Sequence, residues 1–457
     1  MLPTISTGNV ASALAGEYEV ANSLRFDDAS SDNLSRTFSG SSTSNRILTI
    51  SCWFKKVENG ISQYIFDGGN SSGNENPISF NTDDEFLFGQ YNGSSDDFAL
   101  ATDAKCRDLS AWYHLVAAID TTQSTQSNRL KMYINGIQQS LHGGTQVPQN
   151  LDLFTLGAST KYFGRPVWTS SSRRLNGYLA EFYLIDGQQL TPTSFGEFDS
   201  DSPNIWKPIE YEGTFGNYGF YLDFENASSL GADVSGNSNN FTVNNLTSID
   251  QTTDTCTNNF ATLNPLDFTG SITSSEGNTV FQGGRYKATF GVSSGKWYWE
   301  AKRLNAPDNA YIGIKADDGD WNNSYNNSYT YYTSNGNYYL NGSSQGSYGS
   351  SSTTNDILIF ALDMDNGKFY VGENGTFYNS GDPASGTNPM ASSISGTYLP
   401  AVINNSSSGT DQYSFNFGNP SFTISSGNAD ANGHGNFEYA PPSGFFALCT
   451  KNLAEFG

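Results

Sequence analysis

The sequence predicts an all-β protein with two antiparallel β-sandwich (jelly-roll) domains in tandem. Hydrophobic residues make up 36% and aromatic residues 14% of the 457 residues, but charged residues only 15%, so the Glu- and Lys-rich surfaces of helices are missing. Short runs of strand-forming residues alternate with Gly, Asn and Ser turns roughly every 8–12 residues. A hairpin pattern also occurs twice, which indicates two domains of related architecture.

The repeated hairpin is clearest in the second half of the chain. Residues 357–362 form an apolar run of strand formers, residues 363–367 (DMDNG) have turn chemistry, and residues 368–371 form a second short strand before Asn374-Gly375. Residues 115–136 repeat this pattern about 240 residues earlier, with a longer connecting loop and again with a final Asn-Gly. The pattern predicts a β-hairpin in each domain.

The strand pattern divides the chain into five segments. In the second sandwich (276–425), residues 297 and 299 are Trp on one face of a strand. In the bridging segment (199–275), residues 219–224 and 241–243 are expected to be strands that complete or abut the first sandwich. In the last, residues 441–445 (PPSGF) are predicted as a rigid exposed turn. The segments are a lead or anchor (1–20), a first sandwich (21–198), a bridging segment with some strands (199–275), a second sandwich (276–425) and a C-terminal tail (426–457).

The net charge of −23 disfavours two classes of partner. An acidic surface repels nucleic acid and anionic membranes, so we expect neither nucleic acid binding nor membrane insertion. The N-terminus has no basic region followed by an apolar run of signal-peptide length, and no stretch is apolar for the length of a membrane-spanning helix. We therefore expect synthesis in a cytosol without an export signal, although the surface composition is that of an extracellular protein.

The four cysteines and three histidines are expected to be structural. Cys52 lies in an apparent strand and is predicted to be a buried free thiol, with a disulfide as the alternative. His114 alternates with apolar neighbours in a strand, so a structural role is predicted. His142 and His434 stand beside glycines and are expected in loops.

The first domain resembles the concanavalin-A-like, laminin-G-like jelly roll over about residues 20–190. The resemblance rests on the order of three motifs: a Trp-Tyr-His strand, a strand ending in Asn-Gly, and the sequence Gly-Tyr-Leu-Ala-Glu-Phe. Together with two earlier strands, the motifs lie at residues 24–26, 48–54, 112–116, 130–136 and 177–182. The resemblance implies an antiparallel sandwich, and such domains often hold Ca²⁺ at a rim.

The second domain resembles SPRY domains over about residues 280–420. The motifs that carry the resemblance lie at residues 294–300 (SGKWYWE), 312–314, 341–342, 348–349, 356–357, 362–367, 374–375 and 398–402. SPRY domains are also curved antiparallel sandwiches, which explains the repeated hairpin.

The two domains together, with residues 180–187 (AEFYLIDG) and 441–450 (PPSGFFALCT), resemble virion structural proteins of tailed, marine-type phages. Such proteins are tail fibres, appendages or head fibres. The resemblance implies a non-enzymatic virion protein, made in the cytoplasm of a bacterial host, that contacts other virion proteins and host-surface glycan or protein. We expect a homo-oligomer. A purely architectural capsid or tail decoration protein is the alternative, and a polysaccharide-degrading glycosidase is a third hypothesis.

A tract rich in Asn, Tyr and Ser between residues 321 and 348 contains the candidate binding site. Tyr329, Tyr331, Tyr338 and Tyr339 fit strand positions of the SPRY pattern and are expected to pack or to lie on the sheet surface. The loop before them offers aromatic rings that stack on sugars or proteins and amides that donate and accept hydrogen bonds. The candidate ligand-binding residues are Trp321, Asn322, Tyr325, Asn326 and Asn327. The alternative is a polar surface that only keeps the protein soluble.

No catalytic residue is predicted. Jelly-roll glycosidases of the laminarinase type carry Glu-x-Asp-x-x-Glu on one strand, which sets the carboxylates on one face. The nearest match, Glu197-x-Asp199, lacks the final Glu and is expected in a loop.

No cofactor is expected, and the ligands of any metal are unknown. Asp363-x-Asp365-x-Gly367 begins like a Ca²⁺ loop, but Asn374 stands where the bidentate Glu is needed, so a turn is predicted. A structural Ca²⁺ at another loop remains the alternative, with carboxylate clusters at residues 27–28, 83–85, 96–97 and 317–320.

Overall fold

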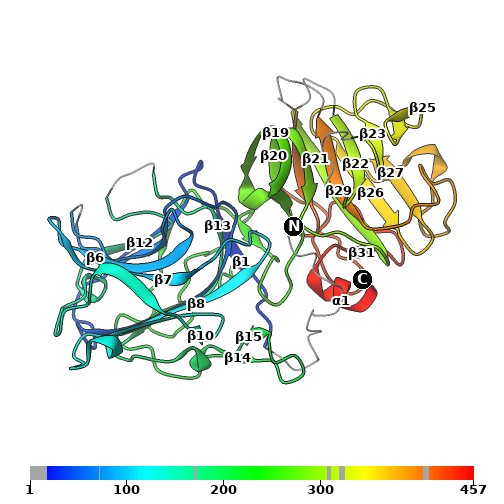
Figure 1. The fold of residues 1–457 in the computed structure, drawn as a ribbon. Helices are drawn as coiled ribbons and strands as arrows, with labels where there is room; N and C mark the ends of the chain where they lie inside the picture. The colour runs from blue at the N-terminus through cyan, green and yellow to red at the C-terminus, as the bar shows by residue number, and fades with distance from the viewer. Residues whose placement is uncertain (1–17, 72, 169–171, 306–309, 319–324, 405–410) are drawn as a thin grey trace. The chain divides into compact units, whose positions relative to one another are not determined.

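The computed structural model describes residues 18–71, 73–168, 172–305, 310–318, 325–404 and 411–457 (Figure 1). The chain divides into two compact units, a first unit of residues 14–257 and a second unit that contains residues 258–457. Nearly all regular structure is strand in large antiparallel sheets, which confirms the predicted fold class. The helical elements of the described residues are α1 (Thr450–Phe456) and the short 3-10 turns η1 (Gln126–Asn128), η2 (Phe154–Leu156), η3 (Pro192–Ser194), η4 (Glu276–Asn278) and η5 (Tyr378–Ser380).

The first unit is built from two eight-stranded antiparallel sheets. One sheet has the order β10-β9-β8-β3-β13-β1-β18, with β16 paired to β13; the other has the order β11-β7-β6-β5-β4-β12-β2-β17. The first sheet contains β1 (Ser23–Phe26), β3 (Ile47–Lys56), β8 (Trp112–Asp120), β9 (Leu130–Ile134), β10 (Ile137–Gln138), β13 (Gly177–Asp186), β16 (Phe220–Leu222) and β18 (Gln251–Thr252). The second contains β2 (Asn33–Thr37), β4 (Gln63–Asp67), β5 (Pro77–Phe80), β6 (Glu85–Tyr91), β7 (Asp96–Lys105), β11 (Leu141–Thr145), β12 (Thr160–Phe163) and β17 (Thr242–Asn244).

The core of the first unit lies between these sheets. Alternate residues of β3, such as Ile50 and Phe54, point into it, as the period of a strand requires. The opposite face of β3 is buried as well, because later segments cover it: Trp206 packs there with Trp53, and Phe195 packs on the same sheet with Tyr183. These covering segments include the small hairpin β14 (Gly196–Phe198) and β15 (Trp206–Pro208).

The expected bridging segment, residues 199–275, is divided between the two units. Strand β16 pairs with β13, β17 pairs with β2 and β18 pairs with β1, so residues up to Thr257 complete the first unit. The prediction that the strands near 219–224 and 241–243 belong to the first sandwich is confirmed. Of the expected lead, residues 1–17 lie outside the described residues, whereas Tyr18 and Val20 pack against the first sandwich.

The second unit contains one sheet that folds back on itself into two halves, and its strands are antiparallel except for one short parallel pair near the C-terminus. Strand β20 (Val280–Ala288) pairs with β30 (Gln412–Asn416) in its first part and with β29 (Tyr398–Asn404) in its second, so it belongs to both halves. The halves enclose one core, which includes Trp299, Ile312 and Phe360. The remaining strands are β19 (Leu263–Ser275), β21 (Lys296–Asn305), β22 (Ala310–Ala316), β23 (Ser328–Tyr332), β24 (Asn337–Leu340), β25 (Ser343–Ser347), β26 (Ile357–Asp363), β27 (Lys368–Glu373), β28 (Thr376–Phe377) and β31 (Phe446–Ala447).

Both predicted hairpins are present. Strands β26 and β27 pair from Asp363 opposite Lys368 outward, and β8 pairs with β9 in the first unit. The predicted exposed turn at residues 441–445 is wrong at Phe445, which is buried in a small second core with Tyr298 and Phe437. The tail covers the outer face of β21 and β26, and sequence periodicity alone does not show this cover. Cys52 is a buried free thiol, as predicted, and all four cysteines are free.

Candidate functional site

The predicted binding loop is described only in part. Trp321 and Asn322 lie outside the described residues, whereas Tyr325, Asn326 and Asn327 form the turn that leads into β23. The Nζ atom of Lys315 donates to the backbone oxygen of Asn326 at 2.9 Å. The side chain of Asn327 donates to Asp318 at 3.0 Å. These bonds fix the backbone of the turn, while the side chain of Asn326 is exposed.

Tyr325 belongs to a group of four tyrosines that the sheet brings together. Tyr311 of β22 lies opposite Tyr332 of β23, and Tyr339 of β24 lies opposite Thr330, two residues before Tyr332. Because residues two apart on a strand share a face, the three rings stand on one surface of the sheet. We call Tyr311, Tyr325, Tyr332 and Tyr339 the tyrosine cluster; all four are partly exposed.

The rings of the tyrosine cluster contact one another closely. Tyr311 stacks on Tyr332 with ring centroids 4.4 Å apart, and it meets Tyr325 at 5.1 Å and Tyr339 at 4.9 Å edge to face. These separations are those of favourable aromatic pairs. Gly342 also packs closely against Tyr325: a Cβ added to Gly342 would lie 2.9 Å from the Cβ of Tyr325. The cluster is therefore a rigid aromatic surface.

Two phenol groups of this surface, those of Tyr311 and Tyr325, stay neutral at physiological pH. Burial raises the pKa of Tyr311 and of Tyr325 above the usual value for tyrosine. The hydroxyl of Tyr325 has no hydrogen-bond partner among the described residues. That hydroxyl is covered, so the cluster offers mainly the partly exposed faces of its rings.

The carboxylates considered for glycoside hydrolysis are Glu197, on β14, and Asp199, directly after it. The Nζ atom of Lys207 lies 3.5 Å from an oxygen of each. Asp199 also accepts bonds from the backbone amides of Asp201 and Ser202, and the bond from Ser202 is the main cause that lowers its pKa. An acid in glycoside hydrolysis needs a raised pKa, so the surroundings of Asp199 are unsuited to that role.

His114 is buried and structural, as predicted. Its Nε2 lies 2.8 Å from Oγ of Ser51, and Nε1 of Trp206 donates to its Nδ1 at 2.9 Å. Since Nδ1 accepts, the network assigns the proton to Nε2, which donates to Ser51. This polarity is opposite to that of a histidine that activates a serine nucleophile. His142, in contrast, is half-exposed and lies 3.3 Å from Glu85.

Asp363 and Asp365, the acidic residues of the hairpin that begins like a Ca²⁺ loop, have protein partners. Asp363 accepts bonds from the backbone and side chain of Asn366 and lies 3.0 Å from Nζ of Lys296, while Asp365 accepts a bond from the amide of Gly295. The turn predicted for this hairpin is therefore confirmed. Among the residues that the structure describes, no group of three His, Cys, Asp or Glu side chains is arranged to hold a metal ion.

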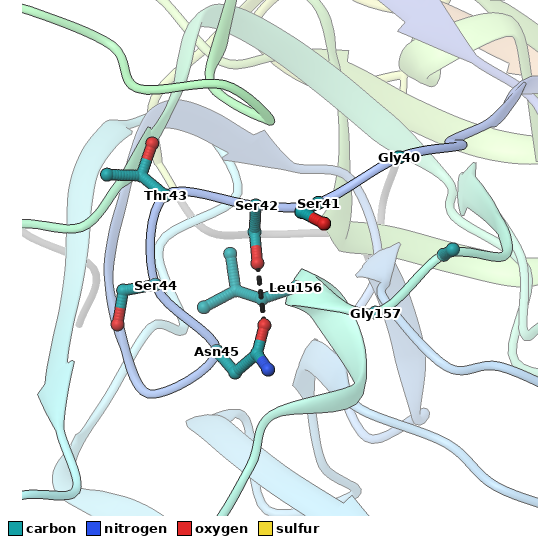
Figure 2. A pocket seen from close by; sticks show the side chains of 9 residues that line it. Gly40, Ser41, Ser42, Thr43, Ser44, Asn45, Leu156 and Gly157 are labelled. Atoms are coloured by element: carbon teal, nitrogen blue, oxygen red, sulfur yellow. Dashed lines mark hydrogen bonds between the residues drawn. The ribbon is translucent and has the colours of Figure 1, made fainter.

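The sequence analysis did not single out a shallow depression at one end of the first sandwich. It has a volume of about 440 Å³ and lies between the loop of residues 40–45 and residues 156–158. Figure 2 shows the Ser and Thr side chains of this loop and the 2.8 Å hydrogen bond from Ser42 to Asn45. Asp186 holds the loop, because its carboxylate accepts bonds from the backbone amides of Thr43 and Ser44. In the sequence, the run of small polar residues at 39–45 (SGSSTSN) could have indicated this exposed polar loop.

Residues 28–194 match the model of the concanavalin A-like lectin/glucanases superfamily. The first unit contains a concanavalin A-like domain. The match runs from before β2 to the end of η3 and so includes most of the two sheets, which confirms the laminin-G-like resemblance seen in the sequence. No curated protein sequence matches the chain.

Three solved structures are similar to parts of this chain. The SPRY domain of human HERC1 is 21% identical, and the match covers 34% of this chain and 96% of that domain with a TM-score of 0.29. A heptameric SAP-like pentraxin from Limulus polyphemus is 16% identical, with coverage of 38% and 80% and a TM-score of 0.26. A protein of Bacteroides ovatus to which carbohydrate binding has been ascribed is 14% identical, with coverage of 51% and 64% and a TM-score of 0.35.

No helix among the residues described has the length and apolar character needed to cross a membrane.

Proposed function

We propose that this protein is a non-enzymatic virion structural protein that binds host-surface glycan through its β-sandwich modules. The observation that carries the glycan-binding proposal is the tyrosine cluster of the second unit. The concanavalin A-like domain supports it, because that superfamily is named for lectins and glucanases. The virion assignment rests on the order of sequence motifs described above.

The chemistry of the tyrosine cluster suits a saccharide. A pyranose ring has an apolar face of C–H groups and a rim of hydroxyls. The rings of Tyr311 and Tyr339 meet edge to face. Their planes therefore differ in orientation, and together they form an apolar surface that can contact a sugar ring from more than one direction. The exposed amide of Asn326 supplies a polar partner beside it. Preformed aromatic anchors of this kind carry much of the free energy of binding at protein surfaces.

A glycan array with the full chain, followed by calorimetric titration of the best ligand, tests the proposal. We expect Tyr339→Ala to weaken binding about tenfold, because it removes one ring of the aromatic surface. The matched control is Tyr338→Ala. Tyr338 is the neighbouring residue of β24, but it packs against the core on the opposite side. This control loses stability and keeps its affinity. Equal affinity of Tyr339→Ala and the unchanged protein contradicts the proposal.

The virion assignment needs a separate experiment. Antibody labelling of purified virions, viewed by negative-stain electron microscopy, is expected to find the protein on the particle. If the antibody does not label the particles, the protein is not displayed on the virion and this part of the proposal is wrong. A labelled particle whose purified protein binds neither glycan nor host cells identifies an architectural decoration protein instead. Turnover of host polysaccharide that is lost in Glu197→Gln identifies a glycosidase.

A further inference from the structure

A second depression lies at the opposite end of the first sandwich from the one in Figure 2. It has a volume of about 390 Å³. It is lined by the turn after β3 (Gly60, Ile61 and Ser62), by Thr82 after β5, and by Arg173 and Arg174 before β13. Asp28, after β1, and Ser172 complete the lining. Two adjacent arginines thus open onto one hollow in a chain that has only 22 Lys and Arg residues and a net charge of −23.

Arg173 is fixed in place by its neighbours. Its backbone oxygen accepts a bond from the amide of Tyr64 at 3.0 Å, and its Nη1 donates to the Tyr64 hydroxyl at 3.1 Å. The guanidinium lies 5.8 Å from the ring centroids of both Tyr64 and Trp168, a distance at which cations and aromatic rings attract. Its φ of 64° is in the left-handed region, which is unusual for a residue other than glycine. The surrounding contacts hold this conformation.

Arg174 differs from Lys56, which is buried, and from Arg107, which is exposed. Nζ of Lys56 lies 2.7 Å and Nε of Arg107 lies 3.3 Å from oxygens of Asp84, so both charges are paired. Arg174 is only partly buried, yet its Nη1 is covered and has no hydrogen-bond partner among the described residues. A covered donor without an acceptor is costly, and such groups in native proteins call for a physical explanation.

The carboxylate in the depression does not supply that acceptor. Among the described residues, Asp28 and Arg174 form no ion pair with each other. Burial and then the charge of Asp27 raise the pKa of Asp28, whose own charge helps to raise the pKa of Glu58. Asp84, which also lies at this end because it accepts a bond from the amide of Gly60, is already occupied by Lys56 and Arg107. The hollow therefore places two guanidinium groups beside the hydroxyls of Ser62 and Thr82, a combination that suits a polar, anionic ligand.

We propose that this depression binds the anionic substituent of an acidic saccharide, a carboxylate or a phosphate ester, through Arg174 and Arg173. The guanidinium of Arg174 gains an oxygen acceptor from the ligand, and that of Arg173 contributes positive charge at a fixed position. Guanidinium groups bind carboxylate and phosphate oxygens in a planar, two-point geometry. Asp28 opposes the ligand charge and limits the affinity. The inference concerns the first unit and uses no residue of the tyrosine cluster, so either can fail without the other.

Calorimetric titration of the full chain at low ionic strength tests the proposal with three probes: D-glucuronate, D-glucose 6-phosphate and D-glucose. We expect one or both anionic sugars to bind and neutral glucose not to bind. Arg174→Gln is expected to lower the affinity about tenfold or more, as for loss of a charge-assisted hydrogen bond. Asp28→Asn is expected to raise the affinity several-fold, because it removes a like charge. The choice between glucuronate and glucose 6-phosphate distinguishes a carboxylate from a phosphate ligand.

Arg46→Gln is the matched control. Arg46 is also an arginine of the first unit, but it is 40% exposed and pairs with Asp152. Its loss changes the net charge equally and is expected to leave the affinity unchanged. The proposal is overturned if neither anionic sugar binds, if Arg174→Gln binds as tightly as the unchanged protein, or if Arg46→Gln weakens binding equally. Circular dichroism shows whether each variant is folded, and the gain expected in Asp28→Asn stays informative should Arg174→Gln unfold.

Discussion

The buried ammonium group of Lys161 is surrounded by oxygen atoms of nearby loops. Nζ of Lys161 lies 2.7 Å from the backbone oxygen of Gly68, 2.5 Å from that of Phe154 and 2.6 Å from Oγ of Ser159. Burial lowers the pKa of Lys161 to about 7, and the charge of Asp67 opposes this effect. Carbonyl and hydroxyl oxygens surround the ammonium group, as oxygen ligands surround a bound metal cation. It thereby joins the loops after β4 and before β12.

His114 shows the same dependence of a polar residue on its surroundings. Its ring is packed between Trp53 and Trp206, with centroids 4.9 and 5.9 Å away. Burial lowers the pKa of His114 to about 3, so the ring is neutral at physiological pH. In the unfolded chain the imidazole has its ordinary pKa of about 6.5.

This difference predicts how stability depends on pH. Between about pH 6.5 and pH 3 the unfolded chain binds one proton more than the native protein does at His114. The free energy of unfolding of the first unit therefore falls as the pH falls through this window, by about 1.4 kcal/mol per pH unit, and is unaffected by His114 above it. Urea unfolding at a series of pH values measures the slope.

The variant His114→Gln isolates this contribution. Glutamine keeps one donor and one acceptor but does not titrate, so we expect a shallower dependence on pH in this window. His142→Gln is the control, because His142 is half-exposed and lies outside the core. An unchanged slope in His114→Gln shows that other groups cause the loss of stability in acid.

The same type of Asn-Gly turn connects strands at three places in the molecule. Asn135-Gly136, Asn341-Gly342 and Asn374-Gly375 have positive φ at both residues, which is the signature of a type I′ turn. In each case an aromatic residue lies against the glycine: the rings of Trp206 and Tyr439 at the first and third turns, and the Cβ of Tyr325 at the second. The glycine is needed both for its φ and for the close approach of the aromatic residue. The sequence predicted the first and third turns as hairpin ends, but not their aromatic covers.

Gly136→Ala is expected to destabilise the first unit by about 3 kcal/mol. The added Cβ would lie 2.3 Å from the ring of Trp206, in addition to the strain of a φ of 78°. Gly60→Ala is the matched control, because Gly60 has the same φ of 78° and no atom within 4 Å of the added Cβ. We expect Gly60→Ala to cost only the backbone strain, about 1 kcal/mol. Denaturant unfolding compares the two, and equal losses contradict a role for the Trp206 contact.

At the scale of the whole molecule, each unit pairs its strands within itself. The first unit needs residues far beyond the last strand of the concanavalin A-like match, because Trp206 covers His114, and Tyr221 donates to the buried carboxylate of Glu181 at 2.8 Å. Tyr18 and Tyr183 donate to the same carboxylate. Segments before and after the matched region therefore complete its outer face.

A pair of fragments tests this arrangement. Residues 14–257 are expected to fold alone and to unfold in one cooperative transition. Residues 14–198 are expected to lose several kcal/mol of stability or to remain unfolded, because hydrophobic groups of the sheet and the carboxylate of Glu181 lose their cover. Urea unfolding followed by tryptophan fluorescence measures both. Equal stability of the two fragments shows that residues 199–257 are dispensable.

The sequence by itself determined the local features of this protein. Alternating strand patterns and Asn-Gly turns predicted the all-β class, both hairpins and the structural role of His114, because these depend on neighbours a few residues apart. The motif order placed the laminin-G-like region at about residues 20–190, close to the matched range of 28–194. The candidate site was predicted only in part: Tyr325 joins an aromatic surface, while its partners Tyr311 and Tyr332 were not singled out and Tyr339 was expected only to pack or to lie on the sheet surface.

Only the tertiary structure decided which distant side chains meet. The tyrosine cluster depends on the register of β22, β23 and β24, and a shift of one residue would turn a whole strand to its other face. The depression at Arg174 depends on four turns that meet at one end of a sandwich. The buried Phe445 and the Trp206 cover depend on segments that return to a sheet after long intervals. Such contacts arise from the packing of the whole chain, so no local pattern of residues records them.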